Sequence, residues 1–137
     1  MARLSQAAAV GRDEASWRLT MNISAQVLDS TFGQPAAGAR VRLERFGIDS
    51  WHLVANAETD AEGTIESWGH EDLEHGLYRL VFDCDSYFAG LGGMTPYPEI
   101  VVIFRMPIEL DSCQVQVVLA AYSHSTYLGI TEAGWSR

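Results

Sequence analysis

The chain has 137 residues, with nine arginines and no lysine against eighteen aspartates and glutamates, and a formal net charge of −9 at pH 7. This length suits one domain with its own buried core, and the acidic balance argues against nucleic acid or an anionic membrane as a partner. No run of about 20 apolar residues is present that would cross a bilayer. We therefore expect a cytoplasmic protein.

Alternation of apolar and polar residues predicts β-strands along most of the chain. In the first of these, Ile23, Ala25 and Val27 share one face, while Ser24, Gln26 and Leu28 share the other. Further strands are predicted at 39–46, 51–59, 64–68, 76–84, 99–106, 112–120 and 122–130, after the first at 19–29. Residues 1–18 are predicted to form an N-terminal arm, and 131–137 a C-terminal tail, on either side of one domain at 19–130.

Turn residues separate the predicted strands. Gly33, Pro35 and Gly38 indicate a turn over 31–38, because proline cannot donate a hydrogen bond to a strand ladder. A short helix is predicted within 85–93, with Asp85 or Ser86 as its N-cap and a run of glycines at its end. Short strands at turn-marked spacing with one short helix indicate an all-β fold, a two-sheet β-sandwich of about eight strands.

The two cysteines and the histidines give weak signals. Cys84 and Cys113 lack metal-ligand spacing, so buried free thiols are favoured over a disulfide. His70 and His75 flank an acidic stretch without a clear third ligand, and surface residues are favoured over a metal site. No cofactor and no metal are predicted.

Five stretches occur in the order and spacing of a known family. They are residues 25–46, 59–65, 76–88, 97–104 and 122–130. The chain resembles this family, the transthyretin-like family, over about residues 19–130. That family includes transthyretin, a thyroid-hormone carrier, and 5-hydroxyisourate hydrolase, an enzyme of urate breakdown. The resemblance implies a transthyretin-like two-sheet sandwich and a homotetramer built as a dimer of dimers. It also implies a ligand channel across the interface between the dimers.

The resemblance implies where the catalytic residues of the hydrolase would fall in this chain, and this chain has other residues at those positions. The first-strand histidine of the hydrolase falls on Gln26, and the arginine of its Asp-Gly-Arg turn falls on Thr64. Its His-Tyr-His-Val-Pro strand falls on 112–116, and its terminal Tyr-Arg-Gly-Ser falls on 127–130. A carboxamide hydrogen-bonds but has no proton to exchange near pH 7, and one positioned acid–base group contributes roughly 10²–10⁴-fold to a rate. The substitutions therefore predict that hydroxyisourate hydrolysis is lost.

The resemblance also predicts a neutral channel. Gln26, Gln114 and Tyr127 are the candidate catalytic residues, which would act by positioning and hydrogen bonding. The candidate ligand-binding residues are the remaining residues assigned to the channel and its mouth, namely Leu28, Thr64, Ser112, Gln116, Val118, Ser125, Leu128, Ile130 and Trp135. The glutamines have a simpler interpretation as polar residues on a solvated sheet face, and the tail with Trp135 either lines the pocket or is disordered.

Three functions remain open from the sequence. The first is a repurposed enzyme that binds a small cyclic or cyclisable molecule and promotes its cyclisation, rearrangement or ring opening, in bacterial specialised metabolism. The second is a non-catalytic small-molecule carrier or assembly protein. The third is a residual hydroxyisourate hydrolase. A neutral channel lining is compatible with the first two.

Overall fold

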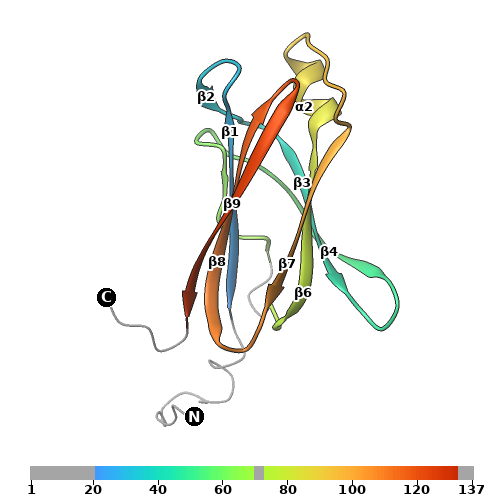
Figure 1. The fold of residues 1–137 in the computed structure, drawn as a ribbon, viewed down its shortest axis with the longest axis vertical. Helices are drawn as coiled ribbons and strands as arrows, with labels where there is room; N and C mark the ends of the chain where they lie inside the picture. Colours follow the sequence, from blue (N-terminus) through green and yellow to red (C-terminus); the bar gives the residue numbers. More distant parts are fainter. Residues whose placement is uncertain (1–20, 70–72, 133–137) are drawn as a thin grey trace.

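The structure is a computed structural model that describes residues 21–69 and 73–132. Its two β-sheets pack face to face, and one short helix lies at one end of the sandwich (Figure 1). The predicted fold class is therefore confirmed. The N-terminal arm, His70 and Trp135 lie outside the described residues.

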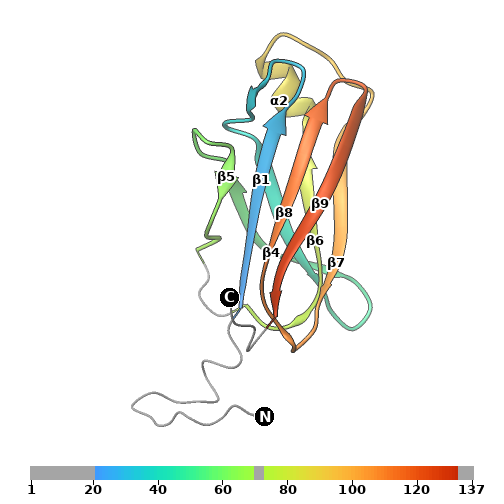
Figure 2. The ribbon, with the colours of Figure 1, turned by 60° about the vertical axis from the view of Figure 1, so that its left-hand side comes forward.

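The first sheet, sheet A, contains both the first and the last strands of the fold. Its strands are β1 (Asn22–Asp29), β2 (Gln34–Pro35), β5 (Thr64–Ile65), β8 (Leu110–Ala120) and β9 (Ser123–Glu132). Their order is β2-β1-β8-β9, and β5 also pairs with β1. The β1 and β8 strands run parallel, whereas the other pairs in this sheet are antiparallel. Figure 2 shows β1, β8 and β9 side by side on one face of the molecule.

The second sheet, sheet B, is antiparallel throughout and has the order β4-β3-β6-β7. Its strands are β4 (Trp51–Glu58), β3 (Arg40–Phe46), β6 (Gly76–Asp83) and β7 (Glu99–Met106). The helix α2 (Cys84–Gly90) connects β6 to β7 and packs over the end of the sandwich. In the described residues, no helix is long and apolar enough to cross a membrane.

Alternation along the strands creates the core between the sheets. In β1, Ile23, Ala25 and Val27 are fully buried, and in β8, Val115 and Val117 are fully buried. Sheet B contributes Leu43, Leu80 and Tyr78 from the opposite side. The polar residues between these positions point outward, because successive side chains of a strand point to opposite faces.

Three local predictions differ from the structure. The N-cap of α2 is Asp83, whose carboxylate accepts the backbone N–H of Ser86 at 2.9 Å, so neither Asp85 nor Ser86 is the cap. Pro35 lies in the short strand β2, where it is tolerated because β2 is the outermost strand of its path. The strand predicted over 64–68 is limited to Thr64–Ile65.

Both cysteines are free and buried, as predicted. Burial raises the pKa of the Cys113 thiol to about 12. Burial, with smaller contributions from nearby acids including Asp83, raises the pKa of Cys84 to about 11. A thiol that remains protonated and inaccessible is a poor nucleophile, so both residues serve as small apolar groups in the core.

A buried hydrogen bond connects sheet A to the helix. The carboxylate of Asp29, at the end of β1, accepts the hydroxyl of Tyr87 at 2.7 Å through one oxygen. Its other oxygen accepts the backbone N–H groups of Thr31 and Phe32. Burial and the hydrogen bond to Asp29 raise the pKa of Tyr87, so its hydroxyl remains a donor. Asp29 thereby anchors both α2 and the loop after β1.

Replacing Tyr87 with phenylalanine is expected to destabilise the protein by about 1–3 kcal/mol, because one oxygen of the buried Asp29 carboxylate loses its partner. Urea denaturation measures the change. Tyr97→Phe is the matched control, since its hydroxyl donates to the Tyr122 carbonyl at an exposed position. Equal stability losses in the two variants would contradict a special role for Asp29.

Candidate functional site

The outer face of sheet A carries a row of polar side chains. Gln26 of β1 lies opposite Thr64 of β5 on one side and Gln116 of β8 on the other. Gln116 in turn lies opposite Tyr127 of β9. Residues in register on neighbouring strands point to the same face, so the four side chains form one row across four strands.

The centre of this row is a hydrogen bond between two carboxamides. The Nε2 of Gln116 donates to the Oε1 of Gln26 at 2.7 Å, and both side chains are half-buried. This bond uses the oxygen of one amide and the nitrogen of the other. The amino group of Gln26 and the carbonyl of Gln116 therefore remain able to hydrogen-bond to a ligand.

The strand register does not place Gln26 beside Gln114, the two glutamines that the sequence suggested as a catalytic pair. Gln114 lies opposite Ser24 and Gly129, one step along the strand from the Gln26 row, and its side chain is exposed. The amide that contacts Gln26 is Gln116, which the sequence analysis placed only among the ligand-binding residues. Ser112 lies one step further away, opposite Asn22.

An apolar row runs beside the polar one. Leu28 lies opposite Pro35 and Val118, and Val118 lies opposite Ser125. A shallow hollow of about 350 Å³ opens here, with Leu28, Pro35 and Val118 in its lining. The contribution of Pro35 was not expected, because its sequence neighbourhood, 31–38, predicts a turn. The outer face therefore offers hydrogen-bonding groups next to an apolar hollow.

Two of the expected ligand-binding residues lie on the other face of the sheet. Leu128 is opposite Val115, and Ile130 is opposite Cys113, both of which are buried in the core. Leu128 and Ile130 keep 39% and 46% of their surface exposed because β9 is an edge strand, not because they face outward. The structure therefore does not bring them together with Gln26, Gln116 and Tyr127.

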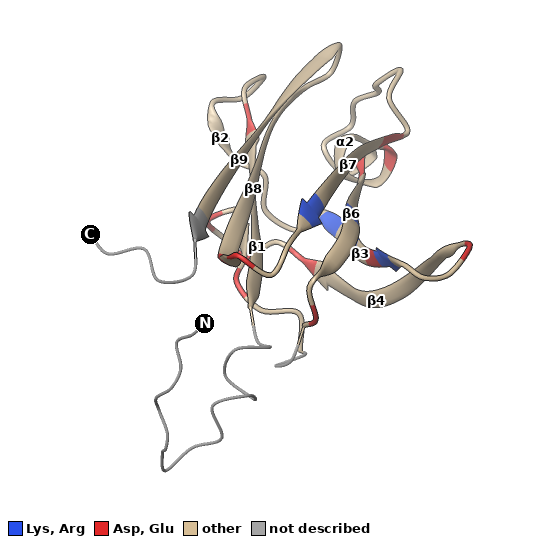
Figure 3. Cartoon of the chain, turned by 60° about the horizontal axis from the view of Figure 1, so that its bottom comes forward, with Lys and Arg blue, Asp and Glu red and all other residues tan. Residues whose placement is uncertain are grey.

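The outer face of sheet A is electrically neutral across these rows. No acid, imidazole or guanidinium is present among its outward side chains on three strands. These are the side chains between Asn22 and Leu28 of β1, between Ser112 and Val118 of β8, and from Ser125 to Gly129 of β9. All arginines that the structure describes lie on β3, β6 and β7 of sheet B, as the blue segments in Figure 3 show. A charged ligand lying over these rows would thus find no opposite charge in them.

The histidines described in the structure are away from the row. His124 is opposite Leu119 on the inner side of β9, with its ring in a T-shaped arrangement 5.0 Å from that of Tyr97. The Nε2 of His75 lies 3.1 Å from the carbonyl oxygen of Leu110. His52 is exposed on β4. Among residues 21–69 and 73–132, no group of three or more His, Cys, Asp or Glu side chains is placed to hold a metal ion.

The outer face can hold a ligand by hydrogen bonds and apolar contact. In a single chain it is an open surface, since Tyr127 is 67% exposed. Enclosure of a ligand would need a second surface facing this one. The chemistry available from the described side chains of the row is positioning and hydrogen-bond donation, without an imidazole or carboxylate to take up a proton.

Comparison with known proteins agrees with this geometry. The model of the HIUase/transthyretin family matches residues 23–129. The chain belongs to this family. The 5-hydroxyisourate hydrolase of Pseudomonas aeruginosa is 32% identical to it over 127 residues, which cover 88% of this chain and 98% of the relative.

Two solved structures of family members share the fold. Transthyretin from Sparus aurata superposes with a TM-score of 0.75 at 23% identity, covering 80% of this chain and 97% of that one. The 5-hydroxyisourate hydrolase of Klebsiella pneumoniae superposes with a TM-score of 0.70 at 28% identity, covering 80% of this chain and 93% of that one. The family that the sequence motifs indicated is therefore confirmed.

Proposed function

We propose that this family member binds a small uncharged cyclic or cyclisable molecule on the outer face of sheet A, in a channel closed by other copies of the chain in a homotetramer. The protein holds that molecule for cyclisation, rearrangement or ring opening, and it does not hydrolyse 5-hydroxyisourate. The observation that carries the proposal is the hydrogen bond between Gln26 and Gln116, at the centre of a row without acid, imidazole or guanidinium.

The arrangement of the two rows supports a ligand of mixed polarity. Small-molecule sites combine an apolar lining with a few placed polar groups that fix orientation. Here the apolar part is the hollow at Leu28 and Val118, and the polar groups are the free ends of the Gln26 and Gln116 amides with the Tyr127 hydroxyl. A charged ring bound here would lose its hydrating water without gaining an oppositely charged side chain, and this desolvation costs free energy.

The same row argues against acid–base hydrolysis. Activation of water needs a group that accepts a proton, and the oxygen of Gln26 already accepts a hydrogen bond from Gln116. What the row supplies instead is orientation, which accelerates reactions whose main obstacle is reaching a reactive conformation. Reactions that occur within one molecule meet this condition best.

Hydroxyisourate hydrolysis is the second candidate, because the Pseudomonas aeruginosa and Klebsiella pneumoniae relatives carry that name. The two candidates are separated by adding purified protein to freshly generated 5-hydroxyisourate and following its decay by absorbance. We expect the decay to equal that in buffer, with the P. aeruginosa enzyme as the active control. Protein-dependent acceleration that is lost on heat denaturation would overturn the proposal.

Binding is tested with a matched pair of probes, quinolin-2-one and its 4-carboxylate, which differ in one charge. Isothermal titration of the full chain is expected to show tighter binding of the neutral compound, because the row offers no cation. Native mass measurement of the same sample is expected to give a tetramer. A monomer, or preference for the carboxylate, would contradict the proposed channel.

A further inference from the structure

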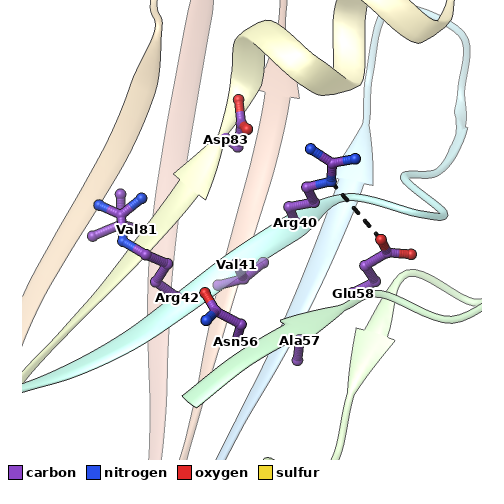
Figure 4. Close-up of a pocket in the computed structure, with 8 residues that line it drawn as sticks. All are labelled: Arg40, Val41, Arg42, Asn56, Ala57, Glu58, Val81 and Asp83. Atoms are coloured by element: carbon purple, nitrogen blue, oxygen red, sulfur yellow. Dashed lines mark ion pairs between the residues drawn. The ribbon is translucent and has the colours of Figure 1, made fainter. Parts of the chain in front are cut away.

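A groove lies on the outer face of sheet B, on the opposite side of the sandwich from the proposed channel (Figure 4). Its volume is about 350 Å³, and it is close to the point where β6 leads into α2. The side chains that matter for its chemistry come from three neighbouring strands and are Arg40, Arg42, Asn56, Glu58, Val81 and Asp83.

The distinctive feature of this groove is a pair of opposite charges that do not meet. Val41 of β3 is in register with Phe82 of β6, so Arg40 and Asp83 are the next residues outward along the two strands. Opposite charges at such positions commonly pair across strands. Here Arg40 leans instead toward Glu58 of β4, and no arginine lies within ion-pair distance of Asp83 in the described part of the chain.

Arg40 and Asp83 both keep hydrogen-bonding capacity toward the groove. The Nε of Arg40 is 3.8 Å from the Glu58 carboxylate, too far for a hydrogen bond, and both side chains are largely exposed. One oxygen of Asp83 accepts the N–H of Ser86 at the start of α2. The other oxygen of Asp83 has no hydrogen-bond partner among the described residues. A cationic donor and an anionic acceptor thus face the groove from neighbouring strands.

The second arginine of the lining, Arg42, is already paired with acids outside the groove. The Nε of Arg42 contacts Glu44 at 3.2 Å, and its Nη1 contacts Glu99 at 3.5 Å. Burial acts to raise the pKa of Glu44, but the hydrogen bonds from Arg79 and Arg42 outweigh it and hold that pKa below its usual value. Glu44 therefore stays ionised and keeps Arg42 in place as one wall.

The floor of the groove is apolar. Val81 points to the outer face of sheet B, since it lies opposite Arg42 on β3, yet it is only 2% exposed. Long neighbouring side chains cover it, so an aliphatic group that enters the groove meets mainly the hydrocarbon stems of these side chains. The lining carries both a guanidinium and a carboxylate beside this apolar surface, which favours a ligand that bears both charges.

We propose that this groove binds a small zwitterion, with its anionic group on Arg40, its cationic group on Asp83 and its aliphatic body against the side-chain stems that cover Val81. The anion gains a guanidinium able to offer two parallel N–H groups, and the cation gains the free carboxylate oxygen. A monovalent anion or cation satisfies one group only and leaves the other unpaired.

The test is an NMR titration of the ¹⁵N-labelled full chain with β-alanine, 4-aminobutyrate and 5-aminopentanoate, compared with butyrate and butylammonium. We expect shifts at Arg40, Val81 and Asp83, with one of the amino acids binding about three- to tenfold more tightly than either singly charged compound. The factor is modest because the charges are partly exposed, and binding should weaken when salt is raised from 20 to 500 mM.

Two variants assign the contacts. Arg40→Gln removes the cation, and Asp83→Ser removes the carboxylate while retaining a residue that caps a helix. Each is expected to reduce zwitterion binding to the level of the singly charged compounds, whereas Arg105→Gln, on β7 outside the groove, should leave it unchanged. Equal binding of all five compounds, or no effect of either variant, would overturn the proposal. Neither result bears on the channel of sheet A, whose expected ligand, quinolin-2-one, is uncharged.

Discussion

The Gln116→Leu variant is expected to bind quinolin-2-one about five- to a hundredfold more weakly than the unchanged protein. Leucine removes the Gln116 carbonyl, which in the proposed site accepts a hydrogen bond from the ligand, and the amide that holds Gln26 in position. A ligand donor left without its acceptor costs about 1–3 kcal/mol, which corresponds to this range of dissociation constants. Isothermal titration measures the affinity, and thermal unfolding checks that the variant is folded.

Gln114→Leu provides the matched control, because it makes the same chemical change one register step away, at an exposed position. It should reduce affinity by less than about threefold, since surface changes usually remain within ~0.5 kcal/mol. A larger loss for Gln114→Leu than for Gln116→Leu would show that the ligand lies at the Ser24–Gly129 step, and the site built around Gln26 and Gln116 would be wrong.

Replacing Gly63 with alanine is expected to destabilise the protein by about 2–5 kcal/mol, the largest stability effect we predict for a single methyl group. Gly63 has a φ of +77°, and an added Cβ would lie 2.4 Å from the carbonyl oxygen of Val27. The backbone at Gly63 also accepts the N–H of Val27 at 2.7 Å, which joins the turn before β5 to β1. The clash therefore pushes β5, and with it Thr64, away from Gln26.

The Gly33→Ala variant separates the cost of backbone strain at a positive φ from the cost of a steric clash of the added methyl group. Gly33 also has a positive φ, +66°, but nothing lies within 4 Å of an added Cβ. Its variant should lose only the cost of the left-handed conformation, about 1–2 kcal/mol. Urea denaturation of both variants measures the difference, and equal losses would contradict the contact with Val27 as the cause.

The sandwich could be predicted because half-buried strands alternate. In β8, Val115 and Val117 are buried while Gln114 and Gln116 face outward, so the sequence already carries the burial pattern. The exact helix cap could not be predicted in the same way. Several residues around the start of α2 are able to cap a helix, and only the backbone geometry selects Asp83.

The candidate site was harder to predict than the fold. Alternation correctly placed Gln26, Gln116 and Tyr127 on outward faces, but it gave no information on which residue lies beside which. The β1 and β8 strands are parallel and far apart in sequence, and a shift of two residues decides whether Gln26 meets Gln114 or Gln116. Leu128 and Ile130 were predicted from their place in a motif, although alternation puts them on the core side.

The parallel pairing of the first and the penultimate strand has a consequence for synthesis of the chain. The two glutamines that bond to each other are separated by 90 positions, so the earlier one leaves the ribosome long before its partner exists. Contacts of such wide separation form slowly, because the loop between them must be closed first. Until then the outer edge of β1 has no β8 neighbour, and a truncated chain ending before β8 lacks one side of its first sheet altogether. The proposed binding surface is thus among the last parts of the molecule to come into being.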